Sequence, residues 1–209
     1  AGVNTDFFFT VIGDWGQATT QEAQLAPLQN TADPQMILTV GDNTYHTFGT
    51  QAELDSRSLA YYASIFPRSY YFPTLGNHDF HFTSVSGYAG LPSIKTLALP
   101  RNAPATQVER YYSFDSGQAH FTFIDTDSCC DATQTNWLQN DLASSTATWK
   151  FVFLHHAPYS CASGSASFGS NLTVRNAWGP LFEQYGVDIV FIGHDHIWER
   201  SKFIDDYLV

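Results

Sequence analysis

The sequence has few cysteines, few basic residues and no long apolar run. Three cysteines among 209 residues are too few for a disulfide framework. Nine basic residues stand against 20 acidic ones, a formal net charge of −11, and no basic run offers a surface for nucleic acid. No stretch approaches the roughly 20 apolar residues of a membrane helix. We therefore expect a protein that binds neither nucleic acid nor a membrane.

What the sequence does have is aromatic and apolar material. Hydrophobic residues make up 44% of the chain, with 17 Phe and 11 Tyr, which favours a folded core over disorder. This length suits one domain, and we expect a single domain over residues 1–209. The first residues show neither the basic nor the apolar segment of an export signal, so either no signal exists or it has been removed.

Short apolar segments alternate with longer amphipathic ones along the chain. Strands are expected at residues 7–12, 36–40, 70–74, 111–114, 120–125, 149–154 and 189–192. Helices are expected at residues 20–32, 52–66, 135–144 and 173–185, and an irregular loop at 87–105. The alternation of strands and helices predicts an α/β layered domain.

Four local features refine this prediction. Pro27 should kink or delay the first helix, and Thr135 should cap the third. Gly186 is well placed to end the last helix. The strands at 111–114 and 120–125 should pair as a hairpin.

A polar cluster follows each of five predicted strands. In order, the clusters are Gly13-Asp14-Trp15-Gly16, Gly41-Asp42-Asn43-Thr44-Tyr45, Gly76-Asn77-His78-Asp79, His155-His156 and Gly193-His194-Asp195-His196. Ligands of open α/β sheets bind beyond the carboxyl ends of the strands. The five clusters should therefore meet at one edge.

Taken one at a time, these clusters have ordinary explanations. Asp14 or Asp42 alone fits a turn or a helix cap, and His155-His156 fits a buried pair. Taken together, they hold five of the eight histidines and no cysteine, which indicates a shared site for hard or borderline cations such as Fe, Mn or Zn. Five loops supply more ligands than one ion needs, so two ions bridged by a carboxylate are expected.

The order Gly-Asp-x-Gly, Gly-Asp-x-x-Tyr, Gly-Asn-His-Asp, His, Gly-His-x-His is similar to that of the calcineurin-like metallophosphoesterases. Tyr45, three residues after Asp42, narrows the resemblance to the purple acid phosphatases of the small single-domain type. The resemblance spans residues 13–196 and implies an α/β fold of mixed β-sheets packed as a sandwich and flanked by helices.

The resemblance also implies a ligand set for two metal ions. Fe(III) is expected at the first site and Fe, Zn or Mn at the second, with Asp42 bridging. The first site comprises Asp14, Asp42, Tyr45 and His196, and the second comprises Asp42, Asn77, His155 and His194.

The activity implied is hydrolysis of small phosphate monoesters, in which a metal-activated hydroxide attacks phosphorus in line. His78 resembles the family's substrate-binding or proton-donating histidine, and its alternative role is to orient a ligand. Relatives carry another histidine after the His155 position, which residues 162–168 lack, so His156 or His46 is a candidate substitute. The alternatives are a phosphodiesterase or nucleotidase with the same metals, and a non-catalytic metal-binding module. The oligomeric state is left open.

The state of the three cysteines is informative about the cellular compartment of the protein. A bridge from Cys129 or Cys130 to Cys161, such as small family members have, would suit a secreted or periplasmic protein whose signal has been removed. Three reduced cysteines are the alternative. Relatives continue with further strands beyond the last motif, so the chain is either a naturally short form or a shortened one, and residues 204–209 are expected to form a last strand or hairpin.

Overall fold

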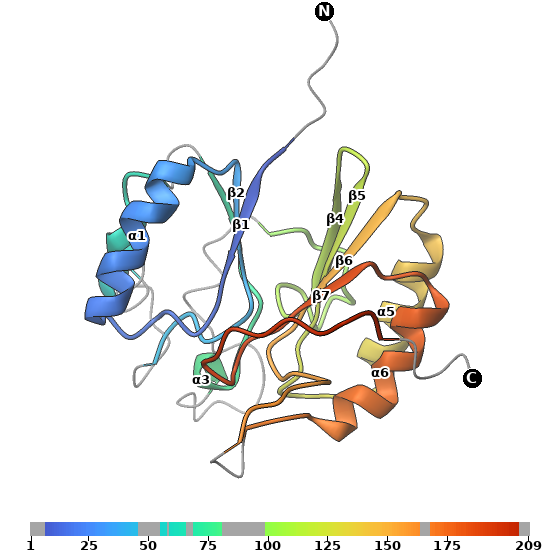
Figure 1. The fold of residues 1–209 in the computed structure, drawn as a ribbon. Helices are drawn as coiled ribbons and strands as arrows, with labels where there is room; N and C mark the ends of the chain where they lie inside the picture. The colour runs from blue at the N-terminus through green and yellow to red at the C-terminus, as the bar shows by residue number, and fades with distance from the viewer. Residues whose placement is uncertain are drawn as a thin grey trace, which may run out of the picture.

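The fold has four layers, with two β-sheets packed face to face and helices covering both outer faces (Figure 1). The computed structural model describes residues 7–45, 55–57, 59–65, 69–80, 99–163 and 168–204. In Figure 1, α1 covers one sheet, and α5 and α6 cover the other. The predicted α/β sandwich flanked by helices is confirmed.

The first sheet is parallel and has the strand order β1-β2-β3. Its strands are β1 (Phe9–Ile12), β2 (Met36–Thr39) and β3 (Tyr70–Phe72). The helix α1 (Thr20–Ala32) connects β1 to β2, and the 3₁₀ helix η1 (Leu59–Tyr62) precedes β3. Because the strands are parallel, the loops that follow them leave from the same edge.

The second sheet has the order β4-β5-β6-β7, antiparallel between β4 and β5 and parallel elsewhere. Its strands are β4 (Tyr112–Ser116), β5 (Ala119–Phe123), β6 (Trp149–Phe153) and β7 (Ile189–Phe191). The helices α5 (Ala132–Ser144) and α6 (Leu172–Gln184) make the crossovers between its parallel strands. The predicted hairpin between β4 and β5 is confirmed.

Side chains alternate between two environments along the buried strands. Leu38 belongs to the core between the sheets, whereas its neighbour Ile37 packs with Tyr62 on the α1 side. In the same way Phe153 lies between the sheets and Val152 faces the α5 and α6 side. This period of two is what a strand buried on both faces requires.

Stacked aromatic rings fill the space between the sheets. Phe123 stacks on Phe153 at 4.7 Å, and Phe153 stacks on Phe191 at 4.9 Å, so one column of rings crosses three strands. Each such pair contributes about 0.5–1.5 kcal/mol beyond the burial of its area. The phenylalanine-rich composition thus supplies a rigid base for the loops at the sheet edges.

Most of the predicted elements are confirmed with small shifts at their ends, and three details differ. Helix α5 starts at Ala132 and not at Thr135, because the Asp131 carboxylate accepts hydrogen bonds from the backbone N–H groups of Thr133 and Gln134. Helix α1 begins at Thr20 and runs through Pro27 to Ala32, so its start is not delayed. The short helix α3 (Asn77–Phe80) was not predicted.

Other predictions fall partly outside the described residues. Of the helix expected at 52–66, residues 55–57 are helical and Leu59–Tyr62 form the 3₁₀ helix. The last strand was expected at 204–209, of which only Ile204 is described, and it is not in a strand. Among the described helices, none combines the length and apolar character needed to cross a bilayer.

The predicted bridge to Cys161 is not formed. Cys161 is an exposed free cysteine, whereas Cys129 and Cys130 lie side by side as chain neighbours in another loop.

A buried histidine ties the β4–β5 hairpin to α5. Nδ1 of His120 lies 2.7 Å from Oδ1 of Asp115, and Nε2 lies 2.9 Å from Oδ2 of Asp141. Burial by itself lowers the pKa of His120, but the hydrogen bonds and charges of Asp141 and Asp115 outweigh it and raise that pKa above its ordinary value. The charged imidazolium therefore links strand and helix.

We expect His120→Gln to destabilise the fold more at acidic than at alkaline pH. A raised folded-state pKa gives stability that is complete below the unfolded value near 6.5 and is lost as pH rises through the folded value. Denaturant unfolding at pH 5 should show a loss of about 1–3 kcal/mol, which shrinks by pH 9. Asp115→Asn, at a largely exposed carboxylate, should cost less than Asp141→Asn. An equal loss for His120→Gln at both pH values would contradict the charged link.

Candidate metal centre

The five polar clusters meet where the carboxyl edges of the two sheets lie together, next to α3 (Figure 1). The clearest link runs between loops that are 180 residues apart in the sequence. The backbone N–H of His194, after β7, donates to both carboxylate oxygens of Asp14, after β1, at 3.0 Å. Since β1 and β7 belong to different sheets, this contact closes the edge of the sandwich.

Four side chains of this edge leave the backbone from left-handed conformations. The positive φ angles are 55° at Asp14, 51° at Asp42, 73° at His194 and 54° at His196. Such conformations cost about 1–3 kcal/mol at non-glycine residues and persist where the surroundings require them. They turn each side chain sharply toward the centre at the end of its strand.

Two glycines allow the loops to approach one another. A Cβ at Gly41, where φ is +96°, would lie 2.3 Å from Nδ1 of His155. A Cβ at Gly76 would lie 2.3 Å from Oδ1 of Asp42 and 2.4 Å from its backbone nitrogen. Any side chain at these positions would displace a residue of the centre, which explains why glycine precedes the polar residues here.

One group of donor atoms surrounds Asp14. The hydroxyl of Tyr45 donates to Oδ1 of Asp14 at 3.3 Å and lies 2.9 Å from Nε2 of His196. That Nε2 is in turn 3.4 Å from the same Asp14 oxygen. These three residues, which we call the Asp14 group, are among those predicted for the first metal ion.

A second group surrounds the amide oxygen of Asn77. This Oδ1 lies 3.0 Å from Nε2 of His155 and 3.0 Å from Nδ1 of His194, and the two ring nitrogens are 3.2 Å apart. Oδ1 of Asp42 lies 3.4 Å from Nε2 of His155. Asn77, His155 and His194, which we call the Asn77 group, belong together with Asp42 to the set predicted for the second ion.

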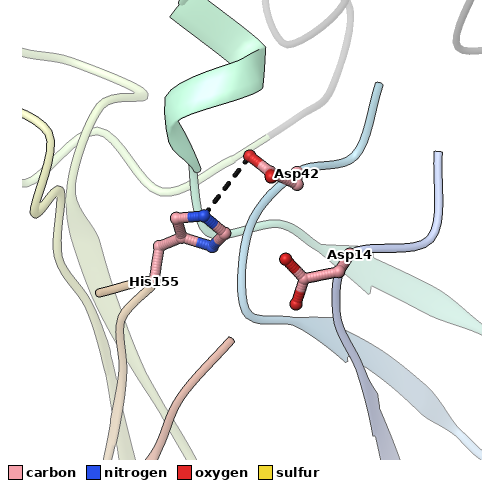
Figure 2. A group of neighbouring side chains, drawn as sticks. All are labelled: Asp14, Asp42 and His155. Carbon is pink, nitrogen blue, oxygen red and sulfur yellow. Dashed lines mark ion pairs between the residues drawn. The ribbon is translucent and has the colours of Figure 1, made fainter. Parts of the chain in front are cut away.

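Asp42 lies between the two groups. Figure 2 shows the carboxylates of Asp42 and Asp14 both near the ring of His155, and a dashed line marks the ion pair between Asp42 and that ring. One ligand atom each from Asp14, Asp42 and His155 lie within 4.8 Å of one another. The structure thus places the Asp42 carboxylate close to ligand atoms from both predicted sets.

The protonation of His155 shows what the centre requires. Nδ1 lies 2.7 Å from the carbonyl oxygen of Val40, which only accepts, so Nδ1 carries the proton. Burial is the main reason that the pKa of His155 falls to about 4, so the ring is neutral and Nε2 holds a lone pair. This lone pair faces the oxygens of Asp42 and Asn77, which are acceptors too. Acceptors facing one another around a point fit a cation.

The shifted pKa values of Asp42 and Tyr45 also indicate a site for cations. Burial and the nearby charge of Asp79 raise the pKa of Asp42 to about 8. Burial and the charges of Asp14 and Asp42 raise the pKa of the Tyr45 hydroxyl well above its ordinary value. Each shift reports buried negative charge without a balancing positive one, so the residues present fit bound cations.

The predicted catalytic histidines flank the two groups. The ring of His78 lies 4.4 Å from that of Tyr45, and its Nε2 is 3.9 Å from Oδ2 of Asp42. The His156 ring lies 4.4 Å from that of His194. His46, the other candidate, falls outside the described residues.

Asn43 and Asp79, for which no role was predicted, connect the loops of the centre by hydrogen bonds. The Asp79 carboxylate accepts hydrogen bonds from the backbone N–H groups of Asn43, Thr44 and Gly76, at 2.8–3.3 Å. Asn43 donates from its own side chain to Asp79 at 3.0 Å and accepts from Trp15 at 3.2 Å. The only sequence signal was their place inside the glycine-led motifs.

A family model for the calcineurin-like phosphoesterases matches residues 9–198. The chain belongs to the calcineurin-like phosphoesterase family. The match covers all five loops of the metal centre, in agreement with the resemblance drawn from the motifs.

Purple acid phosphatases are among the relatives. The chain is 31% identical to purple acid phosphatase 22 of Arabidopsis thaliana, over 93% of this chain and 45% of that protein. It is 26% identical to Fe(3+)-Zn(2+) purple acid phosphatase 12 of the same plant, over 99% of this chain and 46% of the relative. The chain therefore spans a little under half the length of these relatives.

A solved structure shows the same fold. The purple acid phosphatase PPD1 from yellow lupin seeds superposes with a TM-score of 0.69 at 20% identity, covering 89% of this chain and 37% of that one. At this identity the likeness concerns the arrangement of the sheets and helices.

We expect Asp79→Asn to weaken the hydrogen bonds that hold the loops of the centre together. An amide has only one oxygen, so it cannot accept all the hydrogen bonds that the two carboxylate oxygens accept from backbone N–H groups. Unfolding of the metal-free protein should show a loss of about 1–3 kcal/mol. Zn²⁺ affinity, measured by competition with a chelator, should fall about 10–100-fold. Asp33→Asn removes the same charge from the exposed C-cap of α1 and should change neither quantity. Unchanged Zn²⁺ affinity in Asp79→Asn would rule out this role of Asp79.

Proposed function

We propose that this chain hydrolyses phosphate esters at a two-metal centre and prefers monoesters. The observation that carries the proposal is the pair of donor groups, around Asp14 and around Asn77, with the buried carboxylate of Asp42 between them. Family membership supports phosphoester chemistry. The chain spans under half the length of its purple acid phosphatase relatives, so their activity cannot simply be transferred to it. The proposed activity is therefore to be tested on this chain itself.

In this proposal each donor group holds one cation. Asp14, Tyr45 and His196 hold the first, Asn77, His155 and His194 hold the second, and Asp42 bridges both. Two cations bound there supply Lewis acidity, which offsets phosphate charge and lowers the pKa of water. The mixed oxygen and nitrogen ligands suit Fe, Zn or Mn.

Tyr45 supports ferric iron in the first position. A phenolate is a hard, anionic ligand, and the hydroxyl of Tyr45 already faces Asp14 and His196. A relative at 26% identity is named an Fe(3+)-Zn(2+) enzyme, which favours Fe(III) here with Zn, Fe or Mn in the second position.

The remaining polar side chains orient the substrate. His78 has a side chain 35% exposed beside Tyr45 and Asp42, so it can reach a bound ester and donate a proton to the leaving oxygen. Its backbone N–H also donates to Oδ1 of Asp42 at 2.9 Å, which fixes the carboxylate between the two groups. His156 faces the ester from the side of His194.

Monoester preference rests on the names of the relatives, since mono- and diesterases share such centres. Small phosphorylated molecules are the proposed substrates. A secreted or periplasmic location stays a prediction.

The deciding experiment compares p-nitrophenyl phosphate with bis(p-nitrophenyl) phosphate on metal-loaded protein. We expect the monoester to have the higher kcat/KM and both activities to disappear after chelation. Asp42→Asn, which weakens the bridge, should lower kcat/KM at least about 100-fold. A higher rate on the diester would make the chain a phosphodiesterase, and no turnover of either ester would favour a non-catalytic module.

Iron-loaded protein should show a broad visible absorption band that Tyr45→Phe abolishes, because phenolate-to-Fe(III) charge transfer needs the phenolate oxygen. Tyr185→Phe at the end of α6 serves as the matched control and should keep the band. A colourless iron-loaded wild type, or a band that survives in Tyr45→Phe, would exclude Tyr45 as an iron ligand.

A further inference from the structure

Thr126 holds His156 by two hydrogen bonds from one side chain. Oγ1 of Thr126 accepts from the backbone N–H of His156 at 3.0 Å and lies 2.8 Å from its Nδ1. Thr126 follows β5, and His156 follows the neighbouring strand β6, so the two loops are clamped at the edge where the metal centre lies. No local pattern in the sequence predicts this pair.

The position of the hydroxyl proton follows from its surroundings. Thr126 is 4% exposed, and within the described residues Nδ1 of His156 is the only acceptor within reach of its hydroxyl. A buried hydroxyl without an acceptor would be costly, so the proton points at Nδ1. Nδ1 therefore accepts, and the proton of the neutral ring is on Nε2.

Nε2 of His156 is available to donate a hydrogen bond to a ligand. Within the described part of the chain it has no hydrogen-bond partner, whereas Nδ1 is held. The ring packs against His155 at 5.1 Å and His194 at 4.4 Å, so it borders the Asn77 group. His78 borders the Asp14 group through Tyr45. The two histidines thus adjoin different halves of the centre.

We propose that Thr126 is a positioning residue that fixes His156 in the Nε2–H form and aims this N–H at an oxygen of the bound phosphate. This rests on the proposed function and adds a role that the metal ligands do not supply. His156 is then a fixed hydrogen-bond donor to phosphate, and proton donation to the leaving group falls to His78.

The test uses Thr126→Val, which keeps the shape and removes the hydroxyl, and Thr126→Ser, which keeps the hydroxyl. In ¹⁵N-histidine-labelled protein, NMR should show the Nε2–H form of His156 in wild type and Thr126→Ser, and a changed tautomer balance in Thr126→Val. This readout needs no turnover, so it distinguishes failure of this inference from failure of the proposed hydrolysis.

Binding of inorganic phosphate to Zn²⁺-loaded protein, measured by calorimetry, supplies the second readout. Thr126→Val should weaken it about 10-fold and Thr126→Ser much less. In a His156→Phe background, Thr126→Val should have no further effect, since the ring it positions is gone. Zn²⁺ content should stay at the wild-type level in every variant.

Thr122→Val is the matched control. It removes a buried hydroxyl from β5 that donates to Asp141, away from the centre, and should leave phosphate binding unchanged. The proposal is overturned if Thr126→Val keeps the Nε2–H form, if it binds phosphate as wild type does, or if its effect persists in the His156→Phe background.

Discussion

The centre depends on one electrostatic constraint, the close burial of acceptor groups that face one another. The lone pair on Nε2 of His155 faces the oxygens of Asp42 and Asn77, because Nδ1 keeps the ring proton and donates its hydrogen bond to the carbonyl of Val40. Asp14 adds a further carboxylate within 4.8 Å. Such an assembly is unfavourable by itself and becomes favourable when cations occupy it.

The rest of the fold holds these groups in place against their repulsion. The stacked phenylalanines between the sheets fix the strands, and the strand ends fix the origins of the loops. Asp79 and Asn43 then join the loops after β2 and β3, while the His194 backbone joins β7 to Asp14 across the two sheets. Left-handed conformations at Asp14 and Asp42 show that the loops bear strain at the site.

The two histidines beside the donor groups differ in their surroundings, which suits them to different roles. The side chain of His78 is 35% exposed and adjoins Tyr45, whereas His156 is clamped by Thr126 and adjoins His194. A clamped ring suits binding and orientation, because its geometry is set before the substrate arrives. An exposed ring suits proton transfer, because it can exchange its proton with water.

The fold class, most of the element positions and the polar residues that line the edge could be predicted from the chain's local patterns. Strand periodicity and glycine-led motifs are such local features. The helix α3 and the clamp of Thr126 on His156 came only from the structure. The clamp joins residues 30 positions apart, so it depends on where two different loops lie in space and not on any local pattern of the chain.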